Sequence, residues 1–77
     1  MKNMEITKMF KKYLNQQLHK RDWTQRELSG KMGVHESLVS RWMKGERVPT
    51  LPNIIKLASL FETSVDEILG AMGKLDV

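Results

Sequence analysis

Residues 24–45 read TQRELSGKMGVHESLVSRWMKG, and this stretch decides how the rest of the chain is interpreted. Thr24 and Glu27 have the T-x-x-E spacing of a capping box, in which each side chain accepts a backbone N–H of the other residue at a helix start. A helix is therefore expected directly after Thr24. Gly33 should end it, because glycine readily adopts the left-handed conformation common at helix C-termini.

A second helix should follow almost at once, starting near Glu36 and closing at Gly45. The apolar residues of both segments fall at helical spacing, which favours one buried face on each. They are Leu28 and Met32 in the first segment and Leu38, Val39 and Trp42 in the second. Two helices joined by a short turn containing glycine form a helix-turn-helix unit.

A longer amphipathic helix is expected upstream, over residues 5–20, with Asn3 as a weak N-cap. Its apolar positions share one face and its lysines take the other. The apolar face holds Ile6, Met9, Phe10, Tyr13, Leu14 and Leu18. We interpret this face as core. A basic helix lying on a membrane surface is the alternative, but the following helices offer a protein surface instead.

A fourth helix is expected after Pro49, with Thr50 as its cap and Pro52 in its first turn. Its apolar residues are all expected in the core: Leu51, Ile54, Ile55, Leu57, Ala58 and Phe61. Five helices joined by short loops predict a compact all-α domain.

Ser64 and Glu67 repeat the capping-box spacing and predict a short fifth helix, which Gly70 should end. Its apolar residues are Val65, Ile68 and Leu69. Residues 71–77 show no periodicity and are expected to form a coil, in which Leu75 and Val77 are candidate contacts to a partner. We therefore place the domain at residues 1–70, with its core at 6–69, and a C-terminal tail at 71–77.

The chain of 77 residues is long enough for one small domain with a modest core. It has no cysteine, so disulfides and thiolate metal sites are excluded. No apolar run approaches the roughly 18 residues of a membrane span, and the N-terminus lacks the apolar segment of a signal peptide. We expect a soluble cytoplasmic protein with no membrane partner.

The net charge of +4 is unevenly distributed. Residues 1–47 hold 11 of the 13 basic side chains and 5 of the 9 acidic ones, a balance of +6, whereas residues 48–77 hold 2 and 4, a balance of −2. The basic half includes the two-helix stretch. This favours a polyanionic partner, although a solvated lysine-rich surface would give the same balance.

Four separated motifs together resemble the helix-turn-helix domain of the lambda/434 repressor and Cro type, the Xre family. They are T-Q-x-E-L-S-x-K-M-G-V, S-x-x-S-R-W-x-x-G, P-T-L-P-N-I-I-K-L-A and S-V-D-E-I-L, and the similarity covers residues 6–69. The resemblance implies a lambda repressor-like fold whose second and third helices form the helix-turn-helix. It also implies a bacterial, phage or mobile-element regulator that binds operator DNA as a homodimer.

Three residues depart from the family pattern. Ser29 replaces the usual Ala, and its small size should still allow close helix approach. His35 stands where the third helix usually has a Ser or Thr cap, so that helix start should be looser unless His35 contacts a phosphate. Glu62 replaces a frequent Gly, which would cost roughly 1–2 kcal/mol if the backbone there is left-handed.

The resemblance maps base contacts onto the third helix, whose N-terminal residues face base edges in the major groove. These candidates are Glu36, Ser37, Ser40 and Arg41. The Arg41 fork matches the guanine O6 and N7 acceptors; its alternatives are a phosphate contact or a salt bridge with Glu36 or Glu46. Glu36 either accepts from a cytosine amino group or simply stabilises the helix start.

Phosphate contacts are expected at the edges of this surface. The family uses the Gln at the start of the second helix on the DNA backbone, and helix N-termini bind phosphates well. The candidates are Thr24, Gln25, His35, Lys44 and Arg47. Lys11, Lys12 and Lys20 are interpreted as solvated charges instead.

Catalysis finds little support in the sequence. His19 and His35 lack companions at a metal-ligand spacing, and no glycine-rich phosphate loop precedes a helix. We expect a non-enzyme without metal or cofactor, most simply a repressor associated with the nucleoid when bound. The alternatives are an antitoxin, with a toxin or antirepressor as protein partner, and an interaction module without DNA binding.

Overall fold

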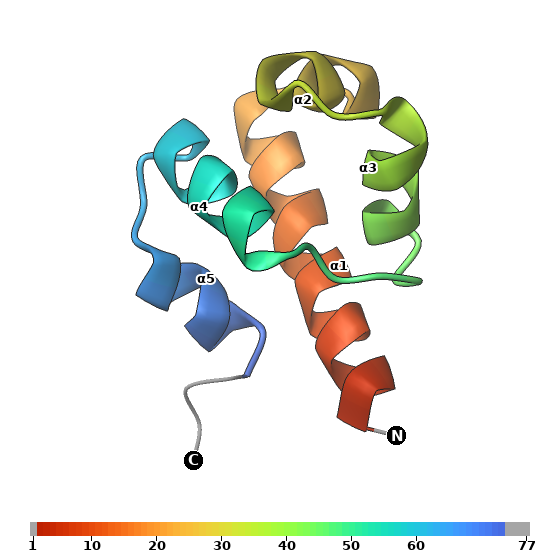
Figure 1. The fold of residues 1–77 in the computed structure, drawn as a ribbon, viewed down its shortest axis with the longest axis vertical. Helices are drawn as coiled ribbons and strands as arrows, with labels where there is room; N and C mark the ends of the chain where they lie inside the picture. Colours follow the sequence, from red (N-terminus) through yellow and green to blue (C-terminus); the bar gives the residue numbers. More distant parts are fainter. Residues whose placement is uncertain (1, 74–77) are drawn as a thin grey trace.

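Residues 2–73, which the computed structural model describes, form five helices. They are α1 (Lys2–Arg21), α2 (Gln25–Met32), α3 (Glu36–Met43), α4 (Leu51–Leu60) and α5 (Val65–Ala71). The predicted all-α class is confirmed. The long α1 lies between α3 and α5 and contacts both, while α4 packs on α2 and α5 (Figure 1). The Cα atoms span 34 × 23 × 22 Å.

The start and end of α2 follow the local signals in its sequence. The Thr24 hydroxyl accepts the Glu27 N–H at 3.0 Å, and the Glu27 carboxylate accepts the Thr24 N–H at 2.8 Å, so the capping box is complete. Gly33 is left-handed, with φ 71°, and its N–H donates to the Ser29 carbonyl at 2.9 Å. These bonds make the turn into α3 short and well defined.

The bounds of α3 also agree with the prediction. His35 occupies the N-cap with extended backbone, but its side chain makes no capping hydrogen bond. After the last helical residue, Gly45 has φ 77°, and the Glu46 N–H donates to the Arg41 carbonyl at 2.9 Å. The helix therefore has a closed C-terminus and a weakly capped N-terminus.

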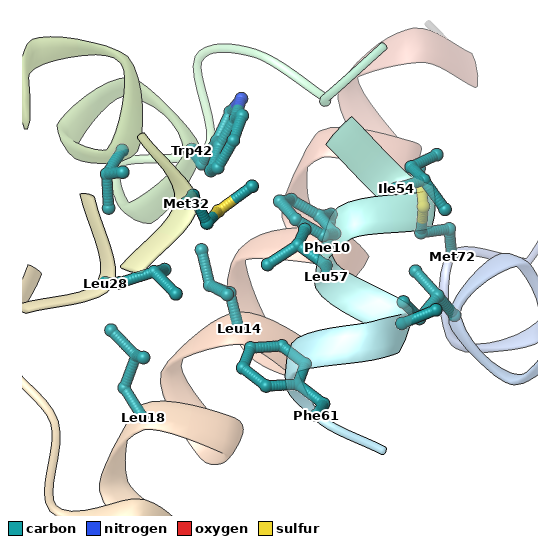
Figure 2. Close-up of a cluster of buried hydrophobic side chains, with 13 residues drawn as sticks. Phe10, Leu14, Leu18, Leu28, Met32, Trp42, Ile54, Leu57, Phe61 and Met72 are labelled. Atoms are coloured by element: carbon teal, nitrogen blue, oxygen red, sulfur yellow. The ribbon is translucent and has the colours of Figure 1, made fainter. Parts of the chain in front are cut away.

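A single apolar core joins all five helices (Figure 2). Phe10 and Leu14 of α1, Leu28 of α2, Trp42 of α3 and Leu57 of α4 are each completely buried. The remaining buried apolar residues are Leu18, Met32, Val39, Ile54, Ala58, Phe61, Ile68 and Met72. The core therefore holds α3 by one face and leaves its opposite face outside.

Three residues expected in the core are instead exposed. Met9 is 43% exposed, Leu51 58% and Ile55 53%. Each lies on a helix whose apolar residues cover a wider arc than the core can contact, so residues at the edge of the arc turn to solvent. Leu38, also expected in the core, is only partly buried against it.

Two of the expected N-caps are absent. The first helix begins at Lys2, so Asn3 lies inside it and cannot cap it. Thr50 occupies the N-cap position of α4, but its side chain makes no capping bond. Local sequence predicts where a polar residue would suit a helix start, and the surrounding chain decides whether the hydroxyl or amide is used.

The last helix differs most from the sequence prediction. The Ser64 hydroxyl accepts the Glu67 N–H at 3.0 Å, but the Glu67 carboxylate accepts from the Thr63 hydroxyl, so the second capping box is only half formed. Gly70 lies inside α5, and the left-handed glycine is Gly73, with φ 79°.

The coil expected from residue 71 is therefore wrong at its start. Ala71 is the last residue of α5, and Met72 is 1% exposed in the core beside Ile54 (Figure 2). Burial of Met72 favours the longer helix, because continuing past Gly70 brings one more apolar side chain into the core. Leu75 and Val77 lie outside the described residues.

Candidate nucleic-acid interface

The outer face of α3 carries the residues expected to read bases. Glu36, Ser37 and Arg41 are exposed and Ser40 is half-buried, whereas Val39 and Trp42 on the opposite face are buried. The outer face of α3 therefore presents one carboxylate, one guanidinium group and two hydroxyls. Such a helix has the width that the major groove of B-DNA admits.

The Arg41 guanidinium is available to a ligand. Within residues 2–73 it has no hydrogen-bond or ion-pair partner, so the salt bridges considered with Glu36 and Glu46 are not formed. An exposed arginine has its donors in a planar fork that suits paired acceptors such as guanine O6 and N7. The free guanidinium favours ligand binding over a structural role for Arg41.

The N-terminus of α2, which packs against α3, offers backbone N–H groups. Gln25 is half-buried and Arg26 exposed, and the N–H groups of these two residues lack intrahelical acceptors because they open the helix. The Thr24 N–H, expected as an additional phosphate donor, is already bonded to the Glu27 carboxylate. Thr24 therefore serves first to start α2 and to set the position of Gln25.

Basic side chains flank the C-terminal end of α3. Lys44 and Arg47 are both exposed in the connection to α4. Lys11, interpreted from the sequence as a solvated charge, lies beside them, because a Cβ added at Gly45 would come within 3.3 Å of the Lys11 Cδ. Sequence spacing alone gave no sign that α1 brings a lysine to this point.

A hollow of about 260 Å³ lies between α3 and the start of α4. Its lining includes Leu38 and Trp42 of α3, Arg47 of the connection and Asn53 of α4. The Trp42 indole nitrogen is buried and has no hydrogen-bond partner in the described part of the chain. The hollow shows that the first turn of α4 lies next to α3.

Ser29, expected to allow close helix approach, is buried in α2. Its side chain is 7% exposed and its hydroxyl donates to the Arg26 carbonyl at 2.8 Å. Its own carbonyl accepts the N–H groups of Gly33 and Val34. The serine thus satisfies its polar atoms within α2 and remains small enough for the tight turn.

The arrangement of α2 and α3 is that of a helix-turn-helix, and residues 11–68 match the family model described as helix-turn-helix. The chain belongs to the Cro/C1-type helix-turn-helix family. Members of this family are DNA-binding transcriptional regulators. The helix-turn-helix domain thus accounts for most of the described chain, and α2 and α3 form its helix-turn-helix.

Among curated proteins, the domain is similar to the cryptic phage CTXphi transcriptional repressor RstR of Vibrio cholerae serotype O1 (strain ATCC 39315 / El Tor Inaba N16961). The two are 32% identical over 47 residues, which cover 61% of this chain and 42% of the relative. The helix-turn-helix chain therefore spans less than half the length of that repressor. No solved structure matches it. Across residues 2–73, no helix is both long and apolar enough to cross a membrane.

Proposed function

We propose that this helix-turn-helix domain binds double-stranded DNA at a specific sequence and represses transcription by occupying an operator. The observation that carries the proposal is the free Arg41 guanidinium on the exposed face of a helix whose other face is locked in the core. The similarity to a protein named a transcriptional repressor supports the sign of regulation.

Base readout would belong to the outer face of α3. Arg41 would donate to guanine O6 and N7, a contact that contributes roughly 1–3 kcal/mol of discrimination. Glu36 would accept from a cytosine amino group, and Ser37 and Ser40 would make shorter-range contacts to base edges. Because the Glu36 carboxylate repels phosphate, it favours a position of the α3 N-terminus against base edges in the groove over a position against the DNA phosphates.

Phosphate contacts would surround this face. Gln25 would use its side chain and the N–H groups at the start of α2, supported by Thr24. Lys44 and Arg47 would neutralise phosphates beyond the other end of α3, with His35 at its start. Such contacts position the protein without reading sequence.

The regulator would act as a homodimer on a two-fold operator in the cytoplasm of its host. Half-sites one DNA turn apart, about 34 Å, suit a pair of domains of this size. Regulation by a protein partner, such as a toxin or antirepressor, is compatible with the same surface. The dimer would increase specificity because two weakly discriminating faces read one site together.

The test is selection of duplexes from a random-sequence library by the wild-type chain, followed by affinity measurements on the selected and a scrambled duplex. We expect Arg41→Ala to lose roughly five- to 150-fold in preference for the selected sequence, the range that corresponds to one bidentate contact. Lys12→Ala, an exposed lysine on the α1–α5 side, is the charge-matched control. Selection of no sequence by the wild type would reject the proposal and favour a protein-interaction module.

A further inference from the structure

A hollow of about 450 Å³ lies between α2 and α4, and it is larger than the hollow beside α3. Its lining consists of Lys31 and Met32 of α2 together with Lys56, Ser59 and Leu60 of α4. We propose that this α2–α4 hollow binds an acidic peptide segment of a partner protein. An apolar side chain of the segment would enter the hollow, and its carboxylates would pair with the two lysines. This interaction goes beyond the proposed DNA binding and uses other residues.

The α2–α4 hollow lies apart from the residues proposed to contact DNA. It is lined by the last two residues of α2 and the last two of α4, whereas Gln25 opens α2 and the hollow beside α3 adjoins the start of α4. With 8 residues in α2 and 10 in α4, the two ends of each helix are about 12–15 Å apart. The C-terminal end of α4 also lies across the fold from α3 (Figure 1). A partner segment in the hollow therefore leaves the outer face of α3 open.

The lining combines apolar side chains with two cations. Met32 is buried and Leu60 half-buried, while Lys31 and Lys56 are exposed. No acidic side chain lines the hollow, and neither lysine has an ion-pair partner within residues 2–73. Complementary charges steer partners together, and like charges exclude wrong ones. The chemistry that complements this lining is an apolar side chain flanked by carboxylates.

Both ammonium groups are held at the edge of the hollow by contacts within the fold. The Lys31 Nζ lies 4.7 Å from the centroid of the Trp23 ring, a cation–π arrangement. The Lys56 Nζ donates to the Met32 carbonyl at 3.4 Å, at the C-terminus of α2. An ammonium group has three N–H donors, so both lysines keep donors for a carboxylate. Side chains that are already held lose less conformational freedom on binding, which favours the complex.

The apolar part of the lining favours a peptide over a nucleic-acid backbone as the occupant. Phosphates carry charge but no apolar group that Met32 and Leu60 would remove from water. An acidic segment with a leucine or phenylalanine supplies both the charge and the apolar area. Exposed ion pairs contribute little by themselves. The apolar side chain in the hollow is therefore required for a measurable complex.

The experiment selects peptides from a displayed random-sequence library with the wild-type chain and measures the affinity of the selected peptides by fluorescence anisotropy. The hollow variant is Lys31→Gln/Lys56→Gln. The matched control is Lys8→Gln/Lys12→Gln, which removes two exposed lysines of α1; glutamine suits a helix about as well as lysine. Ser59→Tyr keeps both lysines and places a ring at the hollow. Circular dichroism and thermal melts check that each variant folds as the wild type does.

We expect the selected peptides to carry acidic residues on both sides of an apolar one. The hollow variant should bind them about tenfold more weakly, the loss that corresponds to two exposed ion pairs of good geometry. Ser59→Tyr should weaken binding at least as much, because its ring excludes the apolar side chain, and it decides the matter if the hollow variant does not fold. The α1 control should change the affinity by less than about twofold, because distant exposed charges are screened.

Several outcomes would overturn the proposal. One is a library that yields no binding peptide, or only peptides without acidic enrichment. Equal losses in the hollow variant and the α1 control would show that binding follows net charge alone. A loss confined to Arg41→Gln/Lys44→Gln would place the peptide on the outer face of α3 instead. Self-association of the wild type that the hollow variant lacks, measured by sedimentation, would make a second copy the occupant and reject an acidic partner.

None of these measurements uses DNA, so the result is independent of the proposed function. A chain that selects no duplex can still select acidic peptides that depend on Lys31 and Lys56. Conversely, a chain that selects a duplex but no such peptide keeps the proposed function and lacks the proposed partner site.

Discussion

Phe10 and Trp42 meet edge to face, with their ring centroids 6.1 Å apart and their planes at 85°. Phe10 lies on α1 and Trp42 on α3, and both are completely buried. Such aromatic pairs contribute roughly 0.5–1.5 kcal/mol beyond the burial of their area. Because Arg41 precedes Trp42 on the same helix, this contact also fixes the orientation of the proposed DNA-reading face.

The first prediction concerns the two parts of the Trp42 side chain. Trp42→Ala should lower the free energy of unfolding by roughly 3–5 kcal/mol, because it leaves a large cavity between α1 and α3. Trp42→Phe should cost clearly less, since it keeps a ring against Phe10 and removes an N–H that has no partner. Urea unfolding followed by circular dichroism measures both. Equal losses would mean that the indole N–H makes a stabilising bond.

At Glu62 we predict a substitution that increases the stability of the fold. Its φ is 55°, in the left-handed region that disfavours residues with a Cβ, as expected if Glu62 replaces a glycine of the family pattern. Glu62→Gly should therefore stabilise the fold by about 1 kcal/mol, which a thermal melt would detect. Asp22, with φ 59°, is the matched position. Asp22→Gly should gain less, because Asp tolerates this conformation better. If Glu62→Gly lowered the melting temperature, the inference that the backbone at Glu62 is strained would be wrong.

The start of α3 offers a third prediction. His35 has the extended backbone of an N-cap, but its side chain makes no capping bond. His35→Ser should stabilise the fold by about 0.5–2 kcal/mol, since serine can accept an N–H of the first turn. Thr24→Ala, which removes a formed cap, should cost a similar amount. If chemical denaturation shows no gain for His35→Ser, the first turn of α3 is already satisfied in another way.

The helix-turn-helix could be predicted from sequence because its signals are local. The Thr24–Glu27 box and Gly33 act within one turn of the residues that they organise, and both are present. The unused Thr50 cap and the half-formed box at Ser64 show the limit of the same reasoning. At Ser64 the hydroxyl still caps the helix, but the Glu67 carboxylate accepts from the Thr63 hydroxyl and leaves the other half of the box unformed.

Burial was predictable only in part. The sequence marks Leu51 and Ile55 as apolar, but helical periodicity does not say how wide a face the core will contact. Met72 shows the opposite error: it lies in a segment without periodicity and is nevertheless buried, because α5 continues past Gly70. Contacts between distant segments decide such cases, as they also decide the proximity of Lys11 to Gly45.

Tyr13 gives a prediction for alkaline pH. Burial raises the pKa of its phenol, the nearby Arg21 opposes that rise, and Glu67 adds to it. The neutral phenol is therefore favoured in the folded state, so its stabilising effect is present below the unfolded pKa of about 10 and is lost as pH rises through the folded pKa. Absorbance titration should show late ionisation, and unfolding above pH 10 should show falling stability. Tyr13→Phe should weaken this pH dependence; an unchanged profile would assign it to other groups.

The last prediction separates backbone contact from base readout. If Lys44 neutralises a phosphate, Lys44→Ala should weaken binding to selected and scrambled duplexes alike and reduce the slope of log K against log salt by about 0.9. Lys12→Ala, on the α1–α5 side, should leave the slope unchanged. Arg41→Ala should instead reduce the preference between the two duplexes, because a base contact carries sequence information. If Lys44→Ala changed the preference for the selected duplex without changing the salt slope, the Lys44 side chain would contact bases in the groove. The base-reading surface would then extend beyond the C-terminal end of α3.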